Sequence, residues 1–428
     1  MLRIQILLFI TFLTCVLAAP SPHQKRSFKV ERVRQKDYVA DGPAALRRAY
    51  SKYGIKPSGI KKRFGASSLE FMPKVKNPLV VSKAANTSTN GTEDGEVTAT
   101  GSQNLAEFLS PVSVGGQTLV MDFDTGSSDM WVFNTNLAAS SQTGHTIYDP
   151  TKSTAAATVS GATFDISYGD GSFANGPVGT DQVDIGGATV QAQTIGLPNN
   201  VSTSFVDDTA SNGLLGLAFS SLNTVQPNQA KTFFDNVAGN LSQQVFTANL
   251  RSNSTGSYEF GSIDTTQFQG SLNQVTVDDS NGFWQFTSTT FVVGDGATQQ
   301  NTDSGTAIAD TGTSLLLVDP SVLNGYYTQV TGAIDATEEV GGVVFPCNSS
   351  LPDIAVATGD SMATVSGSNM NFADAGVTNN AGQDLCFGGL QSNEGSSFQI
   401  FGDVFFRSQF VAFQKTDPPS LGIAPHAF

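Results

Sequence analysis

Hydrophobic positions along the chain come in short runs rather than long ones. Val, Ile, Thr and Phe recur a few residues at a time and are separated by Gly, Asn, Asp and Ser. Short runs rich in β-branched and aromatic residues, bounded by turn formers, are typical of strands. The segment "PAALRRAYSKYG" differs, because Ala, Leu and Tyr fall at helical spacings until Gly54. The pattern therefore predicts a large, mainly β protein with a helix in its first sixth.

Two of the apolar runs end in the same polar motif. In "LVMDFDTGSSDMWVF" and "TAIADTGTSLLLV", an acid closes a strand and is followed by Thr-Gly and two hydroxyl residues. The acids are Asp124 and Asp310. Each is followed 92 residues later by the glycine of an apolar-apolar-Gly element, Gly216 and Gly402 respectively. The equal spacing indicates an internal duplication, with two similar lobes related by an approximate twofold axis.

The duplication explains why Asp124 and Asp310 each lie at the end of an apolar strand. A lone buried carboxylate is costly, and one such motif by itself would be read as a surface turn. A twofold axis would bring Asp124 and Asp310 together at the lobe interface, where two carboxyl groups share a proton and titrate as a unit. One can then act as a general base and the other as a general acid. This arrangement suits the attack of water on an amide.

Each acid is followed by the same three kinds of residue. The first hydroxyl can hydrogen-bond across the lobe interface, and the glycine allows close backbone approach and offers its amide to the carboxylate. The next hydroxyl can donate to the outer carboxylate oxygen. These residues are Thr125, Gly126 and Ser127 in the first motif and Thr311, Gly312 and Thr313 in the second.

The N-terminus has the features of a secretory signal peptide. Residues 1–19 contain an early Arg3, an apolar run and a small-residue end, and the run is short for an uncleaved membrane anchor. No later segment is long and apolar enough to cross a membrane. Of three cysteines, Cys15 leaves with the signal, so Cys347 and Cys386 are expected to form a disulfide. Six sequons are available for glycosylation if the host uses them, at Asn86, Asn90, Asn200, Asn240, Asn253 and Asn348.

The charge is divided unevenly along the chain. Residues 20–83 carry 16 Lys/Arg against four acids, whereas residues 84–428 have a net charge of −28. Nucleic acid is not an expected partner behind a secretion signal. We interpret 20–83 as a propeptide that acts as an intramolecular inhibitor and is held on the acidic body by charge attraction. Low pH would protonate the carboxylates and loosen this attachment. A merely disordered basic leader is the alternative. Residues 84–102 read as a flexible linker, and the activation cut is expected between Lys83 and Gly101.

The sequence lacks the residues and motifs that other hydrolytic mechanisms require. The chain has three histidines, His23, His145 and His426, and no HExxH, GxSxG or CxxC motif, so a serine triad, a metal centre or another cofactor is not expected. Glycoside hydrolysis also uses paired carboxylates, but it gives no reason for the duplicated motif. The stronger alternative to a hydrolytic enzyme is a secreted binding protein that has the same two-lobed fold but no catalytic activity.

The signal, the basic leader, both motifs and the ending "FGDVFFRSQFVAFQKTDPPSLGIAP" together resemble the pepsin-like aspartic endopeptidases, above all the secreted fungal aspergillopepsin and penicillopepsin type. The resemblance covers nearly the whole chain. It implies a bilobal β fold, with an N-terminal lobe at 103–275 and a C-terminal lobe at 276–428 around a cleft. It also implies that Asp124 and Asp310 are the catalytic pair of a secreted, monomeric acid protease acting on polypeptides.

The same resemblance assigns a flap over the cleft. "FDISYGDGSFANG" matches the family's β-hairpin flap, with Tyr168 as its substrate-facing tyrosine and Gly169 and Asp170 at its tip. From the residues alone this stretch is simply a hairpin turn. Trp131 matches the tryptophan whose indole N–H holds that tyrosine's hydroxyl, although a plain core tryptophan is the alternative. Asp170 could pair with a basic P1 side chain and so admit Lys beside bulky apolar residues.

Two further family features match. The single C-lobe disulfide of the family corresponds to Cys347–Cys386, and this chain lacks the N-lobe disulfides of some members. In animal zymogens of the family a propeptide Lys-Tyr pair plugs the cleft, with the lysine between the two aspartates. "SKYG" offers Lys52 and Tyr53 for this role, and a solvated charge at a helix end is an equally open interpretation of Lys52.

Overall fold

The computed structural model describes residues 27–31, 40–56, 72–73, 109–167, 172–251 and 256–427. Several predicted features lie outside these ranges: the signal peptide at 1–19, much of the propeptide at 20–83, the linker at 84–102, the flap tip with Tyr168, Gly169 and Asp170, and the sequon at Asn253. The described part of the chain is mainly β, which confirms the predicted fold class. No helix within these ranges is long and apolar enough to cross a membrane.

The first half of the chain forms one eight-stranded sheet. The strands run in the order β3-β4-β10-β5-β8-β7-β6, and β9 pairs with β7. Their bounds are β3 (Leu109–Val114), β4 (Gln117–Asp124), β5 (Met130–Val132), β6 (Ala157–Ser167), β7 (Phe173–Ile185), β8 (Ala188–Gly196), β9 (Asn200–Val201) and β10 (Gly213–Gly216). Strands β6 and β7 are antiparallel neighbours, with Ser167 opposite Phe173, so they are the two arms of the predicted hairpin.

The second half contains three smaller sheets. One has the order β14-β17-β26-β18-β25, with β14 (Gln285–Thr287), β17 (Thr306–Ala309), β18 (Leu316–Val318), β25 (Leu390–Ser392) and β26 (Gln399–Phe401). The second has the order β16-β15-β21-β22, with β15 (Thr290–Val293), β16 (Gln299–Gln300), β21 (Ile354–Thr358) and β22 (Ser361–Val365). The third has the order β19-β20-β24-β23-β2, with β2 (Met72–Pro73), β19 (Ile334–Ala336), β20 (Gly342–Pro346), β23 (Asn371–Thr378) and β24 (Asp384–Gly388).

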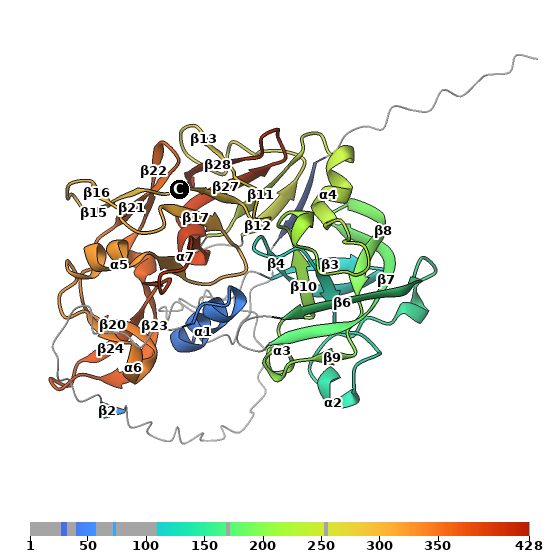
Figure 1. The fold of residues 1–428 in the computed structure, drawn as a ribbon, viewed down its shortest axis with the longest axis horizontal. Coiled ribbons are helices and arrows are strands. Elements are labelled where there is room, and N and C mark those ends of the chain that lie inside the picture. The colour runs from blue at the N-terminus through green and yellow to red at the C-terminus, as the bar shows by residue number, and fades with distance from the viewer. Residues whose placement is uncertain are drawn as a thin grey trace, which may run out of the picture.

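A six-stranded sheet lies between the two halves along the top of Figure 1. Its order is β1-β12-β11-β27-β28-β13, with β1 (Phe28–Glu31), β11 (Val245–Asn249), β12 (Ser257–Phe260), β13 (Asn273–Thr276), β27 (Gln409–Gln414) and β28 (Ser420–Pro425). Strand β13 spans the predicted lobe boundary at 275/276, which stays a prediction. Strand β1 comes from the basic leader, so part of that leader is folded onto the body as a sheet edge.

The predicted N-terminal helix is present as α1 (Gly42–Lys52). The Asp41 side chain accepts a hydrogen bond from the backbone N–H of Ala44 at 2.8 Å, which caps the helix start. Gly54, at φ +62°, follows its end, where the left-handed conformation favours glycine. In Figure 1 this blue helix lies between the green and the orange halves of the molecule.

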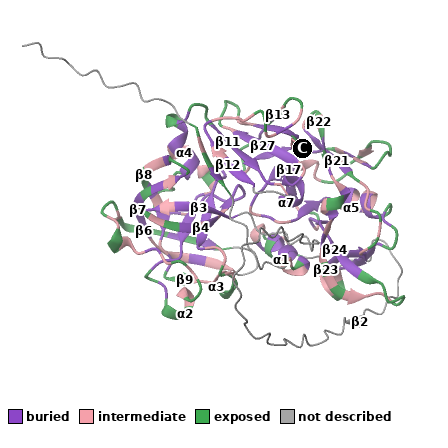
Figure 2. Cartoon of the chain, turned by 180° about the vertical axis from the view of Figure 1, so that it is seen from behind, coloured by how far each residue is buried: buried purple, intermediate pink, exposed green. Residues whose placement is uncertain are grey.

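The remaining helices are short connections. They are α2 (Ala139–Gln142), α3 (Thr203–Asp207), α4 (Phe233–Val237), α5 (Pro320–Tyr327), α6 (Thr337–Val340) and α7 (Asp403–Phe406), with 3₁₀ turns at Pro150–Lys152, Ser220–Leu222, Ala238–Asn240 and Gly367–Met370. Burial follows the layers: Figure 2 shows the buried residues inside the sheets and the exposed ones on the outer loops. One face of α1 is part of the main apolar core, through Ala45, Leu46, Ala49 and Tyr50.

The strand register accounts for the equal motif spacing. Strand β10 runs parallel to β4 with Gly216 beside Asp124, and β26 runs parallel to β17 with Phe401 beside Ala309. Each apolar-apolar-Gly element is therefore the neighbour of the strand that carries an acid. A side chain at Gly216 would collide with the backbone of Ser128, so this close approach requires a glycine.

The expected disulfide is present. Cys347, one residue after β20, is bonded to Cys386 in β24 with an S–S distance of 2.02 Å. The backbone N–H of Cys347 also donates to the carbonyl of Asp384 at 2.9 Å. The bond therefore ties two neighbouring strands of one sheet and closes a loop that contains β21, β22 and β23.

Candidate active site

The two acidic motifs lie face to face at the boundary between the halves. Strand β4 ends on Asp124 and strand β17 ends one residue before Asp310, and both acids are fully buried. A Cβ atom at Gly312 would press on the carboxylate of Asp124, and one at Gly126 would press on the carboxylate of Asp310. The two glycines therefore allow each loop to approach the acid of the other.

Paired hydrogen bonds lock the loops together. The backbone N–H of Thr125 donates to the Thr311 hydroxyl at 3.2 Å, and the N–H of Thr311 donates to the Thr125 hydroxyl at 2.9 Å. In turn, the Thr125 hydroxyl donates to the carbonyl of Ala309 at 2.8 Å, and that of Thr311 to the carbonyl of Phe123 at 2.6 Å. Every bond of this set crosses between residues at least 184 positions apart. The set fixes the relative position of the two acids.

Each carboxylate also receives local donors. The amide of Gly126 donates to Asp124 Oδ1 at 2.8 Å, and the hydroxyl of Ser127 donates to Asp124 Oδ2 at 2.5 Å. On the other side, the amide of Gly312 donates to Asp310 Oδ1 at 3.0 Å, and the hydroxyl of Thr313 donates to Asp310 Oδ2. These are the contacts that the sequence motif predicted for the supporting residues.

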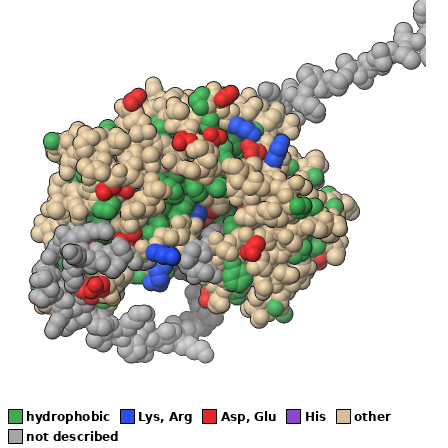
Figure 3. Space-filling view, in the orientation of Figure 1, with side chains coloured by type: hydrophobic (Ala, Val, Ile, Leu, Met, Phe, Trp, Pro, Cys, Tyr) green, Lys and Arg blue, Asp and Glu red, His purple; other side chains and the backbone are tan. Residues whose placement is uncertain are grey.

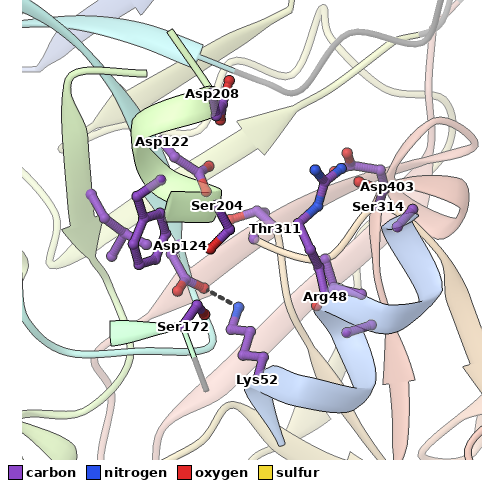
Figure 4. Close-up of a pocket in the computed structure, with 16 residues that line it drawn as sticks. Arg48, Lys52, Asp122, Asp124, Ser172, Ser204, Asp208, Thr311, Ser314 and Asp403 are labelled. Atoms are coloured by element: carbon purple, nitrogen blue, oxygen red, sulfur yellow. Dashed lines mark hydrogen bonds and ion pairs between the residues drawn. The ribbon is translucent and has the colours of Figure 1, made fainter. Parts of the chain in front are cut away.

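A lysine from α1 stands between the two acids. Lys52 Nζ donates to Asp124 Oδ1 at 2.6 Å and to the Asp310 oxygens at 2.9 and 3.0 Å. Figure 4 shows its side chain reaching from the last turn of the helix toward Asp124. Of the two interpretations of Lys52, this geometry agrees with the plug and disagrees with a solvated charge, because only about a tenth of the side chain is exposed.

Burial is the largest single influence on the pKa of each acid and favours the protonated form. The pKa of Asp124 lies above its ordinary value, because burial and the repulsion from Asp310 outweigh the attraction of Lys52. Burial acts in the same direction on Asp310, yet its pKa lies below the ordinary value because Lys52, Thr313 and Tyr53 stabilise its charged form. For Lys52, burial lowers the pKa, but the two carboxylates outweigh it and raise the pKa of the ammonium.

The neighbouring tyrosine occupies the side of the cleft formed by the second half. The Tyr53 hydroxyl donates to Asp310 Oδ2 at 2.6 Å. Its ring meets Phe283 and Phe398 edge to face, with centroids 5.9 and 5.6 Å away, and these two rings are 5.6 Å from each other. The sequence motifs gave no signal for either phenylalanine, because both lie far from the acids along the chain.

A cavity of about 120 Å³ adjoins Asp124 and is lined by residues of both halves and of α1. Asp122, Asp208 and the exposed Arg48 of α1 line it and are labelled in Figure 4. Sequence reasoning missed these residues, although two had a local signal. Asp122 lies two positions before Asp124 on one strand and so shares its face, and Arg48 lies one helical turn before Lys52. Figure 3 shows hydrophobic side chains gathered near the centre of this face, beside the position of α1 in Figure 1.

Trp131 lies beneath the arms of the hairpin. Its ring is buried and contacts Phe205 and Phe133, with centroids 5.0 and 5.8 Å away. Within the described ranges its indole N–H has no hydrogen-bond partner. The partner predicted for it, Tyr168, lies outside those ranges, so this role stays a prediction. No group of three or more His, Cys, Asp and Glu side chains in the described residues is arranged to hold a metal ion.

Comparison with known proteins agrees with this geometry. A model of the eukaryotic aspartyl protease family matches residues 107–426. An aspergillopepsin A-like aspartic endopeptidase of Aspergillus fumigatus is 54% identical over 417 residues, covering 96% of each chain. The aspartic protease PEP3 of Coccidioides posadasii is 50% identical over 96% of this chain and 93% of its own, and aspergillopepsin-1 of Aspergillus oryzae is 42% identical over 97% of each. The chain belongs to the eukaryotic aspartyl protease family. It is an aspartic endopeptidase, a peptide hydrolase of the bilobal pepsin-like fold, and its substrates are peptides.

Proposed function

We propose that this endopeptidase is secreted as an inactive precursor and works in acid. Asp124 and Asp310 are its catalytic residues, and the basic leader is its inhibitor. The observation that carries the proposal is the position of one ammonium group, Lys52 Nζ, within 3.0 Å of oxygens from both acids. A cation at that point occupies the place that a reacting water needs, so the precursor cannot turn over.

The two acids divide the chemistry in the mature enzyme. One carboxylate takes a proton from a water held between them, and the oxygen of that water attacks the scissile carbonyl carbon. The other acid, protonated, gives its proton to the carbonyl oxygen, which yields a gem-diol. Collapse of the gem-diol breaks the C–N bond as the leaving amine takes a proton. No covalent enzyme intermediate forms. The close approach of the two buried carboxyl groups, which cannot both ionise cheaply, favours such a division of roles.

Acid provides the activation signal. The contacts of Lys52 depend on at least one ionised carboxylate, and the leader as a whole is held by its positive charge against an acidic body. Protonation of the acids removes the attraction, and α1 leaves the cleft. A cut between Lys83 and Gly101 then separates the leader from the mature enzyme.

Secretion and specificity complete the proposal. The signal peptide at 1–19 directs export, and the sequons at Asn200, Asn240 and Asn348 are exposed and open to glycosylation. The mature enzyme prefers bulky apolar residues at P1 and accepts Lys there through Asp170 of the flap. An Asp170→Ser variant should lose cleavage after Lys and keep cleavage after Phe or Leu. Unchanged cleavage after Lys would refute that role.

The decisive experiment is activation of the purified precursor. At about pH 3.5, where ordinary carboxyl groups protonate, the wild-type precursor should shorten, expose a new N-terminus between 83 and 101, and cleave peptides. A statine-type inhibitor should block peptide cleavage. The Asp310→Asn precursor should stay folded and inactive after the leader is removed by an added protease. Activity in Asp310→Asn would refute the proposed dyad, and no activity in the wild type would favour an inactive binding protein.

A further inference from the structure

The loop between β25 and β26 contains a strained residue next to the cleft. Glu394 has φ +53°, and it is the one non-glycine residue with positive φ in the described part of the chain. Such a conformation is uncommon for a residue with a Cβ and persists where the surroundings enforce it. Here the N–H of Glu394 donates to the Ser392 hydroxyl at 2.9 Å, and the buried Asn393 side chain donates to Asp319 at 2.6 Å. The loop is thus held rigidly with Glu394 in this conformation.

The same loop accepts the tip of a tyrosine from α1. The Tyr50 hydroxyl donates to the carbonyl of Ser392 at 2.9 Å and, less closely, to Glu394 Oε1 at 3.4 Å. Tyr50 is 7% exposed and its ring belongs to the main apolar core. The space it fills therefore has apolar walls and ends in two hydrogen-bond acceptors. A tyrosyl side chain, with an apolar body and a donor at its tip, matches that space.

This tyrosine site adjoins the catalytic centre. Tyr50 lies two residues before Lys52, which bridges the dyad, on the same helix. At the other end of the loop, Phe398 contacts the ring of Tyr53, whose hydroxyl bonds Asp310. One loop of seven residues, 392–398, thus contacts both tyrosines that flank the blocking lysine.

We propose that the loop 392–398 is a substrate-specificity element, in which the Glu394 carboxylate and the Ser392 carbonyl bind the hydroxyl of a tyrosine in the peptide substrate. The inference rests on the proposed function, in which α1 holds the place of substrate. When α1 leaves, the donor supplied by Tyr50 leaves with it, and a substrate tyrosine restores it. A phenylalanine fills the apolar space but does not supply the hydroxyl donor, so it forms one hydrogen bond fewer than a tyrosine and binds less tightly.

The test compares matched peptides on the enzyme obtained by acid activation of the full-length precursor. Tyrosine and phenylalanine replace one another at each position flanking the cleaved bond. At one position, kcat/KM should be about fivefold higher for the tyrosine peptide than for the phenylalanine peptide, because the net contribution of one hydrogen bond corresponds to a factor of about that size. Glu394→Gly removes the carboxylate and suits the left-handed backbone, so it should lower this ratio toward one. Glu394→Gln keeps an oxygen acceptor and should retain most of it.

The ratio separates specificity from stability. A variant that is merely less stable loses rate on both peptides and leaves their ratio unchanged. Glu338→Gln, on the exposed face of α6, removes the same charge elsewhere and should behave as wild type. A ratio of one at every position in an active wild-type enzyme would overturn the inference while leaving the proposed function standing. An unchanged ratio in Glu394→Gly would equally overturn it. Absence of cleavage on all peptides would refute the proposed function instead.

Discussion

Thr125 and Thr311 exchange hydrogen bonds across the centre of the molecule. Each backbone N–H donates to the hydroxyl of the other residue, at 3.2 and 2.9 Å, although the two residues are 186 positions apart. Each hydroxyl then donates to a carbonyl on the opposite strand. All of these groups are buried, so the bonds position the two acids as well as join the halves.

Replacement of Thr125 by valine should therefore destabilise the protein. Valine keeps the shape, but it leaves the N–H of Thr311 and the carbonyl of Ala309 buried without their partner. We expect a loss of about 2–3 kcal/mol in the free energy of unfolding, measured by urea denaturation, with a fall in kcat. Thr158→Val, at an exposed strand position, is the matched control and should change stability little. Equal stability of the two variants would contradict the structural role.

Lys52 should control latency. In Lys52→Met the buried acids lose their shared cation, so the leader should bind the cleft roughly a hundredfold less tightly, as expected when one partner of a buried ion pair is removed. The precursor should then hydrolyse a peptide without prior acidification. Lys56→Met removes an exposed charge four residues later and should remain latent. A Lys52→Met precursor as inactive as wild type would show that the lysine does not maintain inhibition.

Asp129 should make the fold less stable toward neutral pH. Burial raises its pKa to about 6, against donors from Thr224 that lower it. Because the folded pKa exceeds the unfolded value of 3.8, the folded state binds the proton more tightly. Stability is therefore greatest below about pH 4 and is lost as pH rises through 6, by about 3 kcal/mol at most.

An Asp129→Asn variant should remove this dependence. The amide oxygen can still accept the bonds from Asn223 and Thr224 that Asp129 Oδ1 accepts now. Urea unfolding at about pH 4 and pH 7 should therefore show a smaller difference in the variant than in wild type. A wild-type protein more stable at the higher pH, or a variant with an unchanged difference, would contradict the assignment.

The disulfide should stabilise the second half. Cys347 and Cys386 are 39 positions apart, and a loop of that size corresponds to about 4 kcal/mol in the chain-entropy model. The double variant Cys347→Ser/Cys386→Ser should lose up to that amount in denaturant unfolding. Reduction of wild type should have the same effect, whereas the double variant should not respond to a reductant. A response in the variant would mean that the reductant acts elsewhere.

Several features could be predicted from local pattern. The acid-bearing strands, the two apolar-apolar-Gly elements and a helix ending at Gly54 were predictable, because short apolar runs, helical spacing and turn formation depend on neighbouring residues. The duplication could also be recognised from the sequence. The equal spacing of 92 residues corresponds, in each half, to a parallel pairing between the acid-bearing strand and the apolar-apolar-Gly strand. From these, Asp124 and Asp310 followed as a facing pair.

Tertiary structure alone decided which distant side chains meet. Nothing near Lys52 in the chain determines that its ammonium reaches Asp310, 258 positions away, rather than solvent. The contacts of Tyr53 with Phe398 and of Tyr50 with Ser392 likewise join segments more than 300 positions apart. Such contacts depend on how sheets and helix pack, which no local pattern encodes. The sequence by itself thus indicated the two acids that face one another, and packing determined that Lys52 and Tyr53 lie against them.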